Sequence, residues 1–94
     1  MELSERYIQK LESEGFTNVY EWQDAPGTVY EEHAHAGKVS LMVTDGAATF
    51  HIDGNTKEVI AGERFDVPIG VPHSAVVGPQ AWIVIVGEEI DGDS

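Results

Sequence analysis

Turn residues interrupt this sequence so often after residue 17 that no segment between them suits a crossover helix. The interruptions are Pro26-Gly27, Asp45-Gly46, Asp53-Gly54-Asn55, Ala61-Gly62, Ile69-Gly70 and Gly78-Pro79. The runs between them predict strands at Asn18–Trp22, Thr28–His35, Val39–Thr44, Ala47–Ile52, Lys57–Ile60, Arg64–Val67, His73–Val77 and Trp82–Val86. About eight short strands without crossover helices predict an all-β antiparallel sandwich or barrel. Within it, Asp45-Gly46 and Asp53-Gly54-Asn55 predict tight hairpin turns.

The ends of the chain differ from this middle part. Ser4 to Glu14 predicts one short helix that Ser4 caps and Gly15 ends. Glu88 to Ser94 is acidic and predicts a frayed tail. We therefore expect a single domain over residues 1–94, with the barrel spanning about residues 17–87.

Alternation along the strands predicts which side chains face the interior. The predicted inward faces are mostly apolar: Val39, Leu41 and Val43; Ala48, Phe50 and Ile52; Phe65 and Val67; Ala75 and Val77. His73 shares the face of Ala75 and Val77. Histidines are therefore the polar exceptions in a mostly apolar interior.

Charge and composition exclude several kinds of function. Asp and Glu outnumber Lys and Arg by 17 to 5, for a formal net charge of −12. Such a chain repels phosphate backbones and anionic membrane surfaces, so we expect neither a nucleic-acid nor a membrane partner. Cysteine is absent, so a metal site has to use imidazole, carboxylate or water. With no apolar run of membrane-spanning length and no signal pattern, a cytoplasmic protein is expected.

Three histidines are the candidate metal ligands. His33 and His35 lie two residues apart on a predicted strand, which places their Cα atoms about 7 Å apart on one face. Antiparallel folding can bring His73 opposite this pair. From spacing alone, however, paired histidines on a solvated strand are commoner than ligands, and a lone histidine is more often a core residue.

Glycines and prolines frame these histidines in a recognisable way. Gly27, five residues, His33, one residue and His35, followed later by Gly46, resembles the first motif of the cupins. Gly62, five residues, Pro68, one residue, Gly70, two residues and His73 matches the second cupin motif without a gap. The chain thus resembles the small single-domain cupins, whose fold is a double-stranded β-helix, or jelly roll, that carries a metal ion. The resemblance implies one divalent metal ion on His33, His35 and His73.

Two positions depart from the family pattern. Val39 stands where the first motif usually has a Glu ligand, and Val77 stands where the second usually has Asn. The resemblance therefore implies a three-histidine centre with an open coordination position, as in the thiol dioxygenases and diketone-cleaving dioxygenases of the family. Glu31 has the parity of His33 and could face inward as a distant carboxylate, although exposure is the commoner fate. His51 is expected to face solvent, outside the site.

The expected function is divalent-metal binding with an unassigned activity. Imidazole suits Zn, Fe, Ni or Mn, so the metal is left open. Because the predicted interior offers no cationic clamp and almost no acid–base group, a small neutral substrate and an oxygenase are the favoured enzyme hypothesis. The alternatives are a non-catalytic small-molecule-binding or sensor module and a structural protein whose histidines only pack. Asn18–Trp22 either forms the contact strand of a homodimer or covers the subunit's own sheet.

Overall fold

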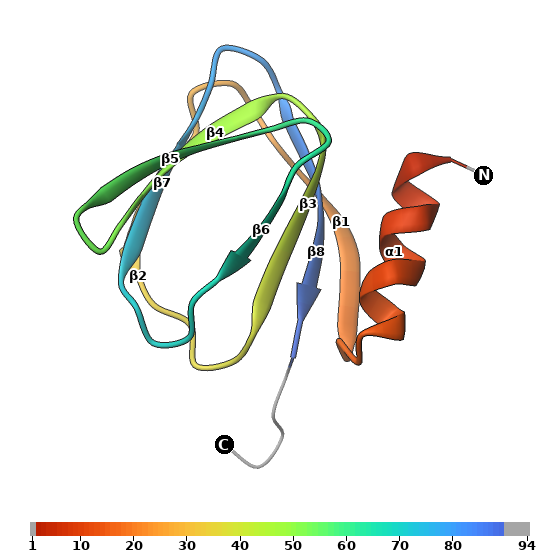
Figure 1. The fold of residues 1–94 in the computed structure, drawn as a ribbon. Coiled ribbons are helices and arrows are strands. Elements are labelled where there is room, and N and C mark those ends of the chain that lie inside the picture. The colour runs from red at the N-terminus through yellow and green to blue at the C-terminus, as the bar shows by residue number, and fades with distance from the viewer. Residues whose placement is uncertain (1, 90–94) are drawn as a thin grey trace.

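The computed structural model describes residues 2–89, which form one helix and eight strands (Figure 1). In chain order these are α1 (Leu3–Ser13), β1 (Asn18–Asp24), β2 (Val29–His33), β3 (Val39–Asp45), β4 (Ala47–Ile52), β5 (Asn55–Ile60), β6 (Arg64–Val67), β7 (His73–Val77) and β8 (Trp82–Glu88). The strands pair antiparallel in two four-stranded sheets, with orders β1-β8-β3-β6 and β2-β7-β4-β5. The predicted all-β jelly-roll barrel with one short N-terminal helix is therefore confirmed.

The helix lies outside the first sheet, beside β1 and β8 (Figure 1). It begins one residue earlier than predicted, with Glu2 at the N-cap and no side-chain capping bond, so the prediction that Ser4 caps it is wrong. Its end agrees with the prediction. Gly15 has φ +95° and donates to Glu12 O, and Phe16 donates to Leu11 O, which together form a Schellman motif.

Of the two predicted hairpin turns, only one joins paired strands. Asp53 and Gly54, both at positive φ, connect β4 to β5 with Ile52 opposite Asn55. The hairpin predicted at Asp45-Gly46 is wrong, because β3 and β4 belong to different sheets. Gly46, at φ +79°, instead turns the chain from the first sheet into the second.

The core lies between the two sheets and follows the predicted alternation. Its buried side chains are Val39, Val43, Ala48, Phe50, Val59, Phe65, Val67, Ala75, Val77, Trp82, Val84 and Val86, with Leu41 and Ile52 packed against them. Phe50 joins the two sheets, since its ring centroid lies 4.8 Å from that of Phe65 and 6.3 Å from that of Trp82. Side chains do not fill the space between the sheets completely, because a cavity remains that is lined by most of these core residues and by three histidines.

The tail was predicted to begin at Glu88, which is too early, because β8 extends to that residue. Glu88 is the last residue of β8, and the Glu89 amide donates to Lys38 O at 2.9 Å. The remainder of that tail, residues 90–94, lies outside the described residues. Across residues 2–89, no helix has the length and apolar character that crossing a membrane requires.

Candidate metal centre

His33 and His73 lie opposite each other on paired strands. His33 ends β2, His73 begins β7, and the two are direct partners in the antiparallel register. Directly opposed residues have Cβ atoms about 5 Å apart. Their ring centroids are 4.5 Å apart, so strand pairing alone brings two of the three predicted ligands together.

A bulge in β2 sets the direction of His33. Between the pairs Tyr30–Ala75 and His33–His73, β2 contains one residue more than β7. Tyr30 and His33 therefore both line the cavity, His33 as an exposed residue, although simple alternation would place them on opposite faces. Glu31, considered as an inward carboxylate, is instead exposed and does not line the cavity.

His35 joins the pair from beyond the end of its strand. β2 was predicted to include His35 but ends at His33, so His35 lies in the following loop. The backbone holds it there, because Gly70, at φ +74°, donates its amide to His35 O at 2.9 Å. Gly70, which belongs to the second cupin motif, thus helps to position His35, which belongs to the first. The His35 ring centroid lies 4.8 Å from that of His33 and 5.2 Å from that of His73.

The three imidazoles suit a metal ion in distance and in tautomer. One ligand atom from each of His33, His35 and His73 can be chosen so that all lie within 4.8 Å of one another. His33 Nδ1 lies 2.7 Å from Glu31 O, and His73 Nδ1 lies 3.1 Å from Val71 O. A carbonyl oxygen only accepts, so these Nδ1 atoms carry the hydrogen and leave Nε2 with its lone pair. The residues present therefore fit a divalent ion.

The electrostatics of His35 agree with this arrangement. Burial lowers the pKa of His35 below its usual value, and the nearby His33 and His73 lower it further, while the Glu88 carboxylate acts in the opposite direction with a smaller effect. A lowered pKa favours the neutral imidazole, which is the form that binds metals.

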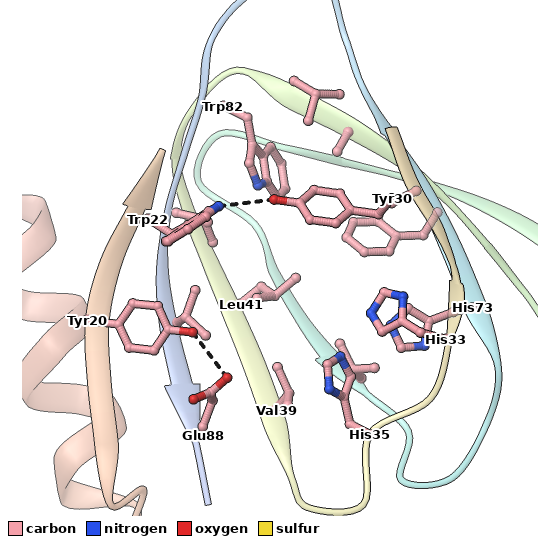
Figure 2. Close-up of a pocket in the computed structure, with 17 residues that line it drawn as sticks. Tyr20, Trp22, Tyr30, His33, His35, Val39, Leu41, His73, Trp82 and Glu88 are labelled. Carbon is pink, nitrogen blue, oxygen red and sulfur yellow. Dashed lines mark hydrogen bonds between the residues drawn. The ribbon is translucent and has the colours of Figure 1, made fainter. Parts of the chain in front are cut away.

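The histidines line one wall of a cavity of about 270 Å³ between the sheets (Figure 2). This volume is close to the lower end of the range for small-molecule sites. Its lining is largely apolar and includes Val39, Leu41, Phe50, Val67, Trp82 and Val84. Val39, on β3, is buried and lines the cavity. Position 39 therefore faces the interior, as the family pattern implies, but its side chain offers no ligand atom.

His51 lies outside this group. It is exposed, as predicted, and its Nδ1 lies 3.1 Å from Thr56 Oγ1 on the outer side of the β4–β5 hairpin. Arg64 also points away from the cavity, toward Glu14 and Asp66.

The cavity also contains acid–base groups that were not predicted from the sequence. Glu88 and Tyr20 line it, and the Tyr20 hydroxyl donates to Glu88 Oε2 at 3.1 Å (Figure 2). Burial, together with this carboxylate, raises the pKa of Tyr20 to about 12. A signal was present in the sequence, because Glu88 continues the alternation of Trp82, Val84 and Val86 by one step. The expectation that the interior holds almost no acid–base group is therefore wrong.

A second polar group joins β1 to β2 at the same cavity. The Trp22 indole N–H donates to Asp24 Oδ1 and to the Tyr30 hydroxyl, both at 3.0 Å, and Figure 2 shows the second of these bonds. The Tyr30 hydroxyl in turn donates to Asp24 Oδ2 at 2.5 Å. Burial and this bond raise the pKa of Tyr30. These atoms satisfy one another and fix the aromatic side of the cavity.

Solved structures similar to this one include several enzymes. The DMSP lyase DddQ from Ruegeria pomeroyi aligns with a TM-score of 0.70 at 21% identity over 81% of this chain and 39% of its own. An RmlC-like cupin from Shewanella frigidimarina aligns with a TM-score of 0.66 at 29% identity, covering 80% of this chain and 68% of its own. The polyketide cyclase RemF from Streptomyces resistomycificus aligns with a TM-score of 0.65 at 28% identity, covering 77% and 54%. This chain thus spans only about two fifths of the lyase and about half of the cyclase.

The family comparison is more direct. A search of curated proteins found no match. The family model described as a cupin domain, by contrast, matches residues 20–86, which run from β1 into β8 and include all three candidate metal ligands. Together with the jelly-roll fold and the RmlC-like structure, this match shows that the chain belongs to the cupin family.

Proposed function

We propose that this cupin binds one divalent metal ion through His33, His35 and His73, and that a small molecule in the cavity occupies a free coordination position of this ion. The observation that carries the proposal is that one ligand atom from each of the three imidazoles lies within 4.8 Å of the other two, at the wall of that cavity. Three neutral nitrogens leave the charge of a dication uncompensated and at least one coordination position free. When bound, such an ion would supply Lewis-acid polarisation or oxygen activation. Zn, Fe, Ni and Mn all remain candidates for the metal.

Metal analysis of protein purified without a histidine tag tests the centre. We expect about one Zn, Fe, Ni or Mn per chain in the wild type and a large loss in His73→Ala. His51→Ala is the matched control, since it removes an imidazole outside the group and should leave the metal content unchanged. Unchanged binding in His73→Ala, or no binding in the wild type, would contradict the proposal.

As the enzyme activity we propose an oxygenase acting on a small substrate. Support comes from the free coordination position and from a largely apolar cavity of about 270 Å³. The similar structures carry different activities, a DMSP lyase and a polyketide cyclase, so neither reaction is transferred to this chain. Oxygen consumption by Fe(II)-loaded protein, across small diketones and phenols, tests the activity against His73→Ala.

A binding module without turnover is the second candidate. It is favoured by the mutual hydrogen bonding of Trp22, Asp24 and Tyr30, which occupies the polar atoms on the aromatic side of the cavity and leaves none of these three groups free to move protons. Saturable ligand binding without oxygen consumption would select this function.

Three expectations, about the oligomeric state, the cellular location and the partners of the protein, stay predictions. β1 is an edge strand of its sheet in the described chain, which leaves Asn18–Trp22 available as the contact strand of a homodimer. Light scattering on the purified protein tests this. The cytoplasmic location and the lack of nucleic-acid and membrane partners rest on the sequence and its charge alone.

A further inference from the structure

Glu88 forms a second polar pole in the cavity, on a strand that carries none of the three histidines. His33 and His73 line the cavity from β2 and β7, whereas Glu88 and Tyr20 line it from β8 and β1 (Figure 2). The carboxylate is held in place, because Asn18 Nδ2 donates to its Oε1 and the Tyr20 hydroxyl donates to its Oε2, each at 3.1 Å. Fixed from two sides, it is a preorganised acceptor.

Several other polar atoms around the cavity already have partners. The indole N–H of Trp22 and the hydroxyl of Tyr30 bond to Asp24 and to each other. The Nδ1 atoms of His33 and His73 face backbone carbonyls. Glu88 differs, because a carboxylate has about four lone-pair sites and its neighbours within residues 2–89 use only one on each oxygen. It therefore has acceptor capacity left for a ligand.

No cation in the described structure neutralises this carboxylate. Neither Lys nor Arg is among the residues that line the cavity. The ion pairs found within residues 2–89 join Lys10 and Arg64 to Glu14 and Asp66, all outside the cavity. The net charge of −12 adds a field that attracts cations to the protein.

We infer that the Glu88 side of the cavity binds a protonated amine, or another cationic hydrogen-bond donor, of a small molecule whose oxygen-bearing end lies at the three histidines. The inference rests on the proposed metal centre and extends it to the class of ligand. It also replaces the expected neutral substrate, since that expectation assumed an interior without a charged side chain beyond the ligands. Both poles line one cavity of about 270 Å³, so a single small molecule can contact both.

Paired hydroxamates separate the two poles experimentally. The hydroxamates of glycine, β-alanine and γ-aminobutyrate share a metal-chelating group but carry their ammonium at increasing distance from it. Each is compared with the alkyl hydroxamate in which a methyl group replaces the ammonium. Calorimetry on the zinc-loaded protein should give at least one chain length at which the amine binds about 10-fold to 100-fold more tightly, the effect of a hydrogen bond to a charged group.

Matched variants assign that preference to Glu88. Glu88→Gln should abolish the amine preference while leaving zinc stoichiometry and alkyl hydroxamate affinity nearly unchanged, which also reports that the cavity is intact. Glu21→Gln, which removes the same charge from an exposed position on β1, should retain the preference. Tyr20→Phe should retain it too, because the carboxylate remains.

The outcomes distinguish this inference from the proposed function. Wild-type protein that binds zinc and alkyl hydroxamates but shows no amine preference at any chain length overturns the inference alone, whether or not a variant folds. A preference that survives Glu88→Gln overturns it as well. Failure of the wild type to bind zinc overturns the metal centre, and the inference with it.

Discussion

Replacing Gly46 by alanine should destabilise the barrel through two separable effects. Gly46 has φ +79°, where a side chain costs about 1–2 kcal/mol of backbone strain. A Cβ there would overlap Ala81 O and lie 3.2 Å from Trp82 Cα, on a backbone segment that β8 holds in place. Overpacking of this kind costs about 1–3 kcal/mol, so the expected loss is about 2–5 kcal/mol in total. This is a large part of the stability of a small domain, about 5–15 kcal/mol.

Gly54 provides the control that isolates the overlap. Its φ of +77° is almost the same, but a Cβ at Gly54 would have nothing within 4 Å. Gly54→Ala should therefore lose only the backbone contribution of about 1–2 kcal/mol. Urea unfolding of both variants without metal, at an m-value of about 1 kcal/mol per molar, should give midpoints about 1–3 M apart. Coincident midpoints would refute the reasoning, since they would show that the Ala81 segment moves aside at no cost.

Three further predictions concern the core and two ionisable pairs. Phe50→Ala should lower the free energy of unfolding by about 3–5 kcal/mol, because the ring is buried between the sheets; a loss below about 1 kcal/mol in urea melts would contradict this. Arg64 holds the pKa of Glu14 at about 2 instead of 4.5, so the ion pair stabilises the fold above pH 4.5 and this stabilisation disappears as pH falls to about 2. Wild type and Glu14→Gln should accordingly differ in urea midpoint at pH 7 and converge near pH 2, whereas a constant difference would argue against the pair. Glu88→Gln should lower the pKa of Tyr20 from about 12 only part of the way toward 10, because burial is the larger cause; alkaline absorbance titration against Tyr20→Phe measures this, and an unchanged value would contradict it.

Local patterns predicted most of the barrel because its strands have one buried face. Alternation with a period of two placed Val43, Phe50, Val67 and Val77 in the core, where the structure has them. The error at Asp45-Gly46 shows the limit of such patterns. That dipeptide and Asp53-Gly54 have the same turn chemistry, and only the assignment of β3 and β4 to different sheets distinguishes them. Such pairing depends on contacts between residues far apart in the chain.

The three histidines of the candidate site were predicted from the sequence, whereas the positions of its two carboxylate candidates, Glu31 and Glu88, were not. Motif spacing indicated His33, His35 and His73, and the structure brings their rings together. Strict parity also made Glu31 a candidate, but the bulge in β2 turns it outward, and no sequence feature marks that bulge. Glu88 was not predicted as a cavity residue, because the acidic residues after Val86 indicate a frayed tail. The alternation of inward-facing residues nevertheless continues from Val86 to Glu88, and this alternation is the correct signal.

The cavity contains a carboxylate, that of Glu88, although Val39 stands where the family usually has a Glu ligand, and the strand register explains its position. Val39 on β3 pairs directly with Glu88 on β8, and Glu88 pairs with Asn18 on β1. The cavity therefore presents its carboxylate one strand away from the position that usually ligates the metal in this family. Asn18 and Tyr20 then draw that carboxylate toward β1, on the side away from His33 and His73 (Figure 2). A dication on three neutral imidazoles would keep its full charge, while the opposite wall keeps a fixed negative charge. A ligand that spans the cavity with an electron-rich oxygen at one end and a cationic donor at the other matches both charges, whereas an isostere lacking the donor leaves the carboxylate unpaired.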